Sequence, residues 1–255
     1  MRGKNKVKSF HQSRIERKKG SAVTFSQLTF HKLEWLEWIA IVISLWFLFY
    51  PRPYIYLFSV LLALPIIGLL LNGLNKPNIV SLVEITKDED GDNKYDVADF
   101  IDFPAMVILV RVLLDFEFDD LSSIILAGAI SFAGVLTLLF LTHKTIGKTS
   151  RSKTWIYLSL IFNICLYSYV GTCGANCIYD KSTPEVYETR VLDKHTYTTR
   201  KSGTRYYFTV APWGHHYDKE DIKVPSGYYN STDIGDTVKI DYKKGLLGIP
   251  WYHLE

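Results

Sequence analysis

Four stretches of this chain are long enough and apolar enough to lie in lipid: residues 35–50, 54–74, 121–142 and 155–171. Hydrocarbon contains no water to satisfy a backbone N–H or C=O group, so runs like these cross it as helices or not at all. The sequence therefore predicts an integral membrane protein built on a helical bundle, with the lipid bilayer as its first partner. It names neither a reaction nor a ligand.

Averages over the whole chain conceal this character, because they mix lipid-like segments with polar ones. The mean hydropathy is +0.06 and 22% of the residues are charged, values that a soluble protein would also show. A chain of 255 residues suggests one or two domains. We expect two unlike parts here, a membrane part up to about residue 171 and a polar part from about residue 179.

Residues 1–33 form a basic leader that contains nine Lys/Arg and a single acidic residue, Glu16. Basic residues beside a first span hold that flank in the cytoplasm. This interpretation is favoured over nucleic-acid binding, because the leader lacks interleaved aromatic residues and a nucleic-acid fold signature. A cleaved signal peptide is not expected, since the first apolar run ends in Tyr-Pro-Arg-Pro-Tyr (50–54) and not in a small-residue cleavage site.

The first two apolar stretches, within residues 34–74, are predicted to form a tight antiparallel hairpin. A span needs about 17–25 apolar residues. The first stretch reaches this length only when it is counted from residue 33 to residue 50, with Trp35 and Trp38 in the interface. Pro51 and Pro53 then break the helix and turn the chain directly into the second span.

Residues 100–118 form an apolar segment that carries Asp102, Arg111 and Asp115. One interpretation is an amphipathic helix that lies in the interface. The other is a crossing helix, in which Arg111 and Asp115, one helical turn apart, neutralise each other. Residues 143–153 favour the crossing, because they contain four Lys/Arg and no acidic residue and should therefore be cytoplasmic like the leader. An even number of crossings must then separate leader and linker.

This argument predicts five spans and a C-terminal domain on the far side of the membrane, in the periplasm or outside the cell. If residues 100–118 only lie flat, the last domain is cytoplasmic. The predicted order is a basic cytoplasmic leader (1–33), a membrane hairpin (34–74), a small cytoplasmic hairpin loop (75–99), two membrane helices (100–142), a basic cytoplasmic linker (143–153), a last membrane helix (154–172) and a soluble β domain (180–255).

Residues 79–99 are typical of a short β-hairpin around a Gly turn. Its turn, Asp-Glu-Asp-Gly-Asp-Asn (88–93), is acidic and raises the question of a calcium site. The turn lacks the alternating ligands and the terminal Glu of an EF-hand loop. We therefore interpret it as a solvated turn.

From residue 185 the pattern becomes that of a β-sheet. Short runs rich in β-branched and aromatic residues predict five strands, at 186–192, 205–210, 221–224, 237–242 and 249–253. Polar and Gly-containing stretches separate them. About five short strands in about seventy residues favour a small antiparallel barrel of OB-like or SH3-like type.

The tail of the chain carries three distinctive segments, Ala-Pro-Trp-Gly (211–214), Gly-Asp-Thr-Val (235–238) and Gly-Leu-Leu-Gly-Ile-Pro-Trp (245–251). In these segments, about a quarter of the chain, it resembles uncharacterised bacterial multi-pass membrane proteins. The resemblance implies a location in the bacterial inner membrane and a β fold at the C-terminus. It implies no activity and carries over no catalytic residue.

Charged residues at membrane depth often mark a pathway or a ligand site, which makes Asp102, Arg111 and Asp115 candidate functional residues. The alternative is structural, because both acids lie near the ends of their segment and Arg111 can pair with Asp115 or extend to the interface. We favour the structural pair.

Cys173 and Cys177 lie just past the last predicted span, and a disulfide between them is predicted if that side of the membrane is oxidising. Two thiols without the CxxC spacing do not make a metal site. His215 and His216 follow Pro-Trp-Gly (212–214) in a loop between predicted strands, and we interpret them as part of a polar, partly exposed loop. Within a strand, adjacent histidines rarely bind one metal because their side chains point to opposite faces, and no nearby Cys/His pattern completes a site. We therefore assign no metal, no cofactor and no catalytic residue.

The C-terminal domain is charge-balanced and rich in Tyr and Trp, residues favoured at interfaces. The first functional hypothesis is a non-enzymatic binding or scaffolding role, in which this domain contacts a protein partner. A second is a small transporter or membrane enzyme that uses Arg111 with Asp102 and Asp115. A third is an envelope sensor that links the outer domain to the basic leader. The sequence indicates no oligomeric state.

Overall fold

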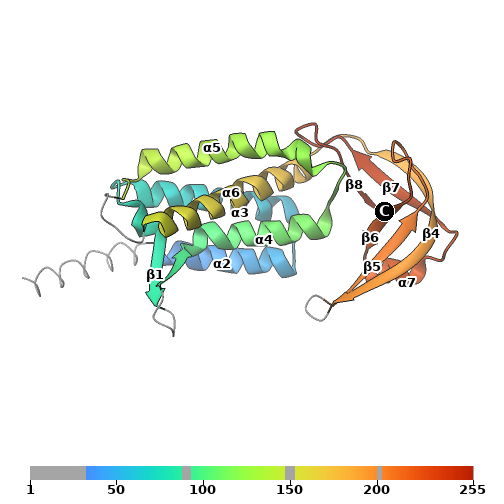
Figure 1. Ribbon diagram of the computed structural model, residues 1–255, viewed down its shortest axis with the longest axis horizontal. Helices are drawn as coiled ribbons and strands as arrows, with labels where there is room; N and C mark the ends of the chain where they lie inside the picture. The colour runs from blue at the N-terminus through green and yellow to red at the C-terminus, as the bar shows by residue number, and fades with distance from the viewer. Residues whose placement is uncertain (1–32, 88–92, 147–152, 200–202, 255) are drawn as a thin grey trace, which may run out of the picture. The chain divides into compact units, whose positions relative to one another are not determined.

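The computed structural model describes residues 33–87, 93–146, 153–199 and 203–254 (Figure 1). The basic leader and most of the basic linker therefore lie outside the described residues, as does the acidic turn weighed as a calcium site. The chain divides into two compact units. The helical unit contains the described residues up to Arg111 together with 128–171, and the β unit contains 112–127 and the residues from Thr172 onward.

Every segment predicted to be a membrane helix is helical. The helices are α2 (Glu34–Phe49), α3 (Tyr54–Gly73), α4 (Asp99–Asp115), α5 (Ile124–Thr142) and α6 (Lys153–Ile178). Among the described residues, three helices are long and apolar enough to cross a membrane, namely α3, α5 and α6. This number is smaller than the five predicted. Helices α2 and α4 have 16 and 17 residues, and at about 1.5 Å per residue they are a few ångströms shorter than about 30 Å of hydrocarbon.

Helix α3 packs closely against its neighbours through small residues. Gly68 lies against the ring of Phe100 on α4, and Gly73 lies against Thr142 at the end of α5. The hydroxyl of Tyr167 on α6 donates to a backbone carbonyl of α3. Small residues let helix backbones approach closely, which is how helices associate when the surroundings are as apolar as the side chains.

The ends of α3 and α5 meet through backbone hydrogen bonds. The amide of Ile79 donates to the carbonyl of Lys144 at 3.0 Å, and the amide of Lys144 donates to the carbonyl of Pro77 at 2.7 Å. A short 3₁₀ helix (Ile79–Leu82) then leads into β1 (Val83–Lys87), which pairs antiparallel with β2 (Asn93–Val97). The predicted hairpin is confirmed, and α4 begins directly after it.

The β unit is a curled antiparallel sheet, which Figure 1 shows as a half-barrel. Its strands, in the order β3-β8-β7-β4-β5-β6, are β3 (Glu117–Phe118), β8 (Trp251–Leu254), β7 (Thr237–Lys243), β4 (Glu185–Thr199), β5 (Gly203–Val210) and β6 (Glu220–Val224). A short helix, α7 (Ser226–Ser231), follows β6. All five predicted strands are present. Within the described residues the end strands β3 and β6 do not pair with each other, so the sheet is open where a closed barrel was predicted.

Strand β4 is much longer than predicted because it has two partners. Its first part, Glu185 to Arg190, pairs with β7, and its second part, Val191 to Thr199, pairs with β5. The register shifts between Val191 and Asp193, where the strand changes partner. Such irregularities bend a strand and increase its twist. The curl of the sheet follows from this position.

Strand β3 comes from a segment far from the C-terminal domain in sequence. It lies between α4 and α5, where Glu117 pairs with Tyr252 and Phe118 pairs with Trp251. The ring of Phe116 meets the ring of Trp251 edge-on at 5.1 Å. The connection between α4 and α5 is therefore part of the β sheet.

The core of the β unit lies on the inner face of the sheet. Burial alternates along these strands, since Phe208 and Val210 on β5 and Val238 and Ile240 on β7 are buried while the residues between them are more exposed. Among the described residues, one buried cluster contains Val191, Phe208, Val210, Trp213, Ile222, Val224, Val238, Ile240 and Tyr252.

Candidate functional site

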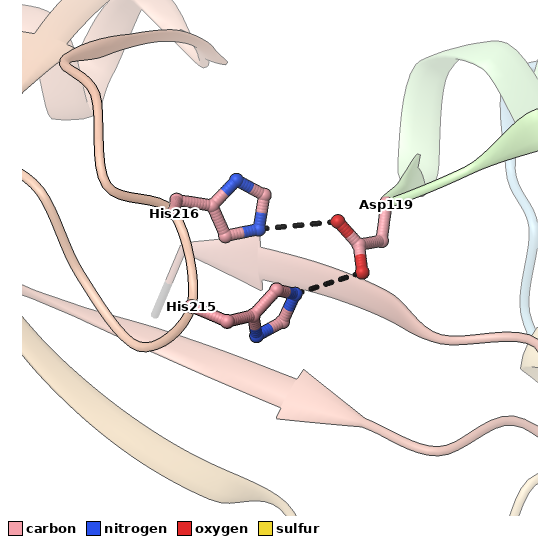
Figure 2. Close-up of side chains that lie close together, drawn as sticks. All are labelled: Asp119, His215 and His216. Atoms are coloured by element: carbon pink, nitrogen blue, oxygen red, sulfur yellow. Dashed lines mark hydrogen bonds and ion pairs between the residues drawn. The ribbon is translucent and has the colours of Figure 1, made fainter.

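Two adjacent histidines and an aspartate converge on one face of the β unit (Figure 2). The Nε2 atom of His215 lies 2.9 Å from Oδ2 of Asp119, and Nε2 of His216 lies 3.2 Å from Oδ1 of the same carboxylate. Each residue offers one ligand atom, and these three atoms lie within 4.8 Å of one another. The carboxylate thus faces one imidazole with each of its oxygens.

A tight turn brings both imidazoles to the same side. Trp213 and His216 exchange two backbone hydrogen bonds, of 3.1 and 2.8 Å, so that only Gly214 and His215 lie between them. Gly214 has φ +53, a left-handed conformation that glycine adopts without the steric cost of a Cβ. Since the histidines stand in a turn and not in a strand, the alternation that would send them to opposite faces does not apply.

Asp119 reaches the histidines because it follows β3. Its amide donates to the carbonyl of Pro250, just before β8, at 3.4 Å. The hydroxyl of Tyr242 donates to Oδ2 of Asp119 at 3.3 Å. Burial, and then the charge of Asp119, raise the pKa of Tyr242 to about 12, so this hydroxyl keeps its proton at neutral pH. Asp119 is therefore held by the bond from its own amide to Pro250 and by the bond that its carboxylate accepts from Tyr242 on β7.

A second carboxylate lies beside the other ring nitrogen of His216. Oε2 of Glu220 lies 3.2 Å from Nδ1 of His216. The other oxygen of Glu220 accepts a 2.7 Å hydrogen bond from the hydroxyl of Tyr252. The indole of Trp213 stacks on the His216 ring, with centroids 4.2 Å apart and planes at 18°. These contacts leave His216 little rotational freedom.

The three side chains are graded in exposure. The side chain of His216 is 17% exposed, that of Asp119 is 21% exposed and that of His215 is 46% exposed. The Nε2 atom of His216 is itself buried and makes no hydrogen bond within the described part of the chain. Two imidazole nitrogens and a carboxylate oxygen form a donor set that can share a proton or hold a divalent transition-metal ion.

The charged residues singled out in the membrane segment all lie on α4. Asp102 is in its first turn, Asp115 is its last residue, and Arg111 is one helical turn before that end. The guanidinium of Arg111 lies over the rings of Tyr54 and Phe47, 5.8 and 6.0 Å from their centroids. Such cation–π contacts give this charge a structural place between helices.

Cys173 and Cys177 do not lie past the last helix, because α6 continues to Ile178. Both thiols are buried and free in the structure. Their spacing of one helical turn places them on the same face of α6. The disulfide between them stays a prediction.

No family model, curated protein or solved structure matches this chain in the three comparisons made. The functional argument therefore rests on the geometry of its own residues.

Proposed function

We propose that this chain is a five-span membrane protein that anchors the β unit on the side of the membrane opposite to the basic leader, where the unit serves as a non-enzymatic binding module. The observation that carries the proposal is the pairing of Glu117 and Phe118 with Tyr252 and Trp251. This pairing requires the α4–α5 connection and the C-terminal strands to be on the same side of the membrane.

The hydrogen bonds at the other end of α5 support a crossing by α4. Thr142 ends α5, and Lys144 then bonds to Pro77 and Ile79, which follow α3. The chain continues from Ile79 through the β1–β2 hairpin into α4, and α4 ends just before β3. Helix α4 therefore joins the same two ends as α5, which is itself a candidate span. If α5 crosses, α4 crosses too.

The charges indicate which end is cytoplasmic. The leader and the linker at 143–153 are both strongly basic, and the linker begins at the α3 end of α5. Basic flanks stay in the cytoplasm. The β unit then lies outside the cytoplasm. The resemblance of the tail to bacterial multi-pass membrane proteins supports a bacterial inner membrane, with the β unit in the periplasm or outside the cell.

Exposed apolar side chains on β4 support a binding role. Val186, Leu192 and Tyr197 are 53%, 48% and 63% exposed. A contiguous exposed apolar patch is typical of a surface that contacts another protein, and we propose that these side chains belong to one.

The topology is tested by labelling single cysteines in intact bacterial cells with a membrane-impermeant maleimide. The variants are Ser231→Cys in α7 and Ser150→Cys in the basic linker, each on a chain whose three native cysteines are replaced by serine. We expect labelling at 231 in intact cells and at 150 only after lysis. Labelling at 231 only after lysis would overturn the outward display of the β unit.

The binding role is tested separately in the full chain. A photo-crosslinking residue at position 192 is compared with one at Lys239, an exposed position on β7. We expect a discrete adduct from position 192 and none from 239, and loss of the adduct when Val186 is replaced by Asp. Absence of any adduct from positions 186, 192 and 197 would contradict the proposal even if the topology holds.

A second candidate is the transporter or membrane enzyme that uses Arg111 with Asp102 and Asp115. The observation in its favour is Oδ1 of Asp102, which is buried and lacks a hydrogen-bond partner within the described residues. Buried acids in membrane helices often belong to ion or proton pathways. The Asp102→Asn variant should then lose proton uptake in reconstituted vesicles while inserting normally. The sensor hypothesis needs, in addition, a signal that passes from the β unit to the leader.

A further inference from the structure

We propose that Asp119, His215 and His216 bind one divalent transition-metal ion of the Zn²⁺ type. The ion would join the α4–α5 connection to the turn before β6. This inference goes beyond the binding role proposed above and is independent of which side of the membrane the β unit occupies.

The spacing of the donor atoms fits such an ion. Zinc binds imidazole nitrogen at about 2.0–2.1 Å and carboxylate oxygen at about 2.0–2.2 Å, so neighbouring tetrahedral ligands lie about 3.3 Å apart. In the structure the two oxygens of Asp119 lie 2.9 and 3.2 Å from the imidazole nitrogens of His215 and His216. The three ligand atoms lie within 4.8 Å of one another, close enough to surround one ion.

The environment of His216 points to a ligand on its Nε2 side. Nδ1 of His216 lies 3.2 Å from Oε2 of Glu220, and Nε2 of the same ring faces Asp119. With a proton on Nδ1, beside the Glu220 carboxylate, Nε2 would present its lone pair to a metal ion. Carboxylates placed in this way orient metal-binding histidines and increase their basicity. Nε2 is buried and forms no hydrogen bond in the described part of the chain. A metal ion would satisfy this atom.

The donor set also selects the class of metal. Calcium and magnesium prefer sites made entirely of oxygen, whereas imidazole suits zinc, copper, iron and nickel. Three protein ligands leave one tetrahedral position open, and the half-exposed His215 places that position toward water. The site therefore accepts an exchangeable water or an additional ligand.

The metal would strengthen the weakest edge of the sheet. Strand β3 has only two residues, and it pairs with a single neighbour, β8. Asp119 immediately follows it. An ion coordinated by Asp119, His215 and His216 would connect this edge to the turn between β5 and β6, the two strands at the opposite end of the strand order.

The experiment uses the full chain in detergent micelles, stripped of metal with a chelator and exchanged into chelator-free buffer. Zinc affinity is measured by competition with a chromogenic chelator, and Co²⁺ is added to record its visible absorption. We expect one equivalent of Zn²⁺ per chain. In H215A, H216A and D119N the affinity should fall by at least about 100-fold, more than the about 10–100-fold expected for Glu220→Gln, which removes only the partner of a ligand.

The matched control is His195→Ala. His195 also lies near a carboxylate, 3.6 Å from Asp221, but outside the cluster. Its loss should leave zinc affinity and the Co²⁺ spectrum unchanged. Because the His215 side chain is nearly half exposed, H215A should keep the fold, and near-ultraviolet circular dichroism checks this. Zinc binding that is absent from the parent chain, or equal in H215A and the parent, overturns the proposal.

Discussion

The contacts that stabilise the inside of the helical unit differ in kind from those that stabilise the inside of the β unit. In the helical unit, α3 meets its neighbours where glycines such as Gly68 and Gly73 allow the helices to approach. In the β unit, polar side chains fix the last loop of the chain. Asn176, at the end of α6, donates from Nδ2 to the carbonyl of Ile249 at 2.8 Å and accepts at Oδ1 from the amide of Leu247 at 2.9 Å.

The difference agrees with the surroundings that we propose for each unit, lipid for the helical unit and water for the β unit. Where the surroundings are apolar, burying more apolar surface adds little, so association depends on close packing. Where a loop packs against a domain in water, each buried backbone N–H and C=O group needs a hydrogen-bond partner. A side-chain amide or carboxylate supplies that partner here. Asp180 acts in the same way, accepting from the amide of Gly245 and from the indole of Trp251, both at 3.0 Å. Substitutions should therefore destabilise the two units for different reasons.

The largest effect is expected for Gly68→Leu in the helical unit. Any Cβ at this position would overlap the ring of Phe100, which is 1% exposed and cannot move aside. Overpacking a tight core costs about 1–3 kcal/mol and occasionally more. We expect a loss at the upper end of this range or beyond, measured as unfolding in mixed detergent and SDS micelles.

Gly134→Leu is the matched control, because a Cβ at Gly134 on α5 would meet nothing within 4 Å. It should change stability little. Equal destabilisation by both variants would mean that the close approach at Gly68 is not what holds α3 to α4.

The next effect should come from Asn176→Ala in the β unit. The change leaves the carbonyl of Ile249 and the amide of Leu247 without their side-chain partner. An unsatisfied buried group costs about 1–3 kcal/mol, so we expect a loss of about 2 kcal/mol, recorded from the near-ultraviolet signal of the β unit. Asn163→Ala is the control, because Asn163 donates within its own helix, to the carbonyl of Ser159 at 3.0 Å. A larger loss in the control would refute the contrast between the units.

The helices and the C-terminal strands could be predicted from the sequence because their signals are local. Apolar runs predict α3, α5 and α6, and alternation predicts β5 and β7. Strand β3 could not be predicted, since two residues, Glu117 and Phe118, have no periodicity of their own. Their conformation depends on pairing with β8, more than a hundred residues later in the chain. The open sheet was missed for the same reason, because closure depends on which strands meet.

The candidate site shows the same limit. The pair His215-His216 was visible in the sequence and was placed in a loop between strands. It was not assigned to a metal site because no nearby Cys or His completed one. Asp119 carried no signal at all, because only the pairing of β3 brings it to the histidines. Arg111 was recognised as unusual, and its aromatic neighbours Phe47 and Tyr54 could not be deduced from spacing.

Acid should affect the two units in different pH ranges. Burial lowers the pKa of His143, which is hydrogen-bonded to Asn72 at the end of α3, below its ordinary 6.5. A depressed histidine pKa means that the unfolded chain binds the proton more readily, so helical-unit stability is complete above about pH 6.5 and falls below it. His143→Gln should remove much of this dependence, measured as detergent unfolding between neutral pH and pH 5.

The β unit should resist until much lower pH. Burial acts to raise the pKa of Asp180, but hydrogen bonds from Ser182, Trp251 and Gly245 outweigh it and hold that pKa below 3.8. Its contribution is therefore present above that value and lost as the pH falls through the lower, folded pKa. The indole of Trp251 donates to Asp180, so the contribution of Trp251 to the near-ultraviolet circular dichroism should change in that lower range. A Trp251 signal already lost near pH 6 would contradict the assignment.

The smallest effect is expected for Tyr252→Phe, which removes one hydroxyl and leaves the ring in the core. That hydroxyl donates to Glu220, and Glu220 in turn lies beside Nδ1 of His216. A hydrogen bond to a charged group contributes about 1.5–3 kcal/mol, and Glu220, whose side chain is 28% exposed, can recover part of this from water. Thermal unfolding should therefore shift slightly, while the ring of His216 gains freedom. Tyr206→Phe, on the same sheet but away from Glu220, is the comparison; an equal shift in both variants would mean that Tyr252 serves the β unit through its ring alone.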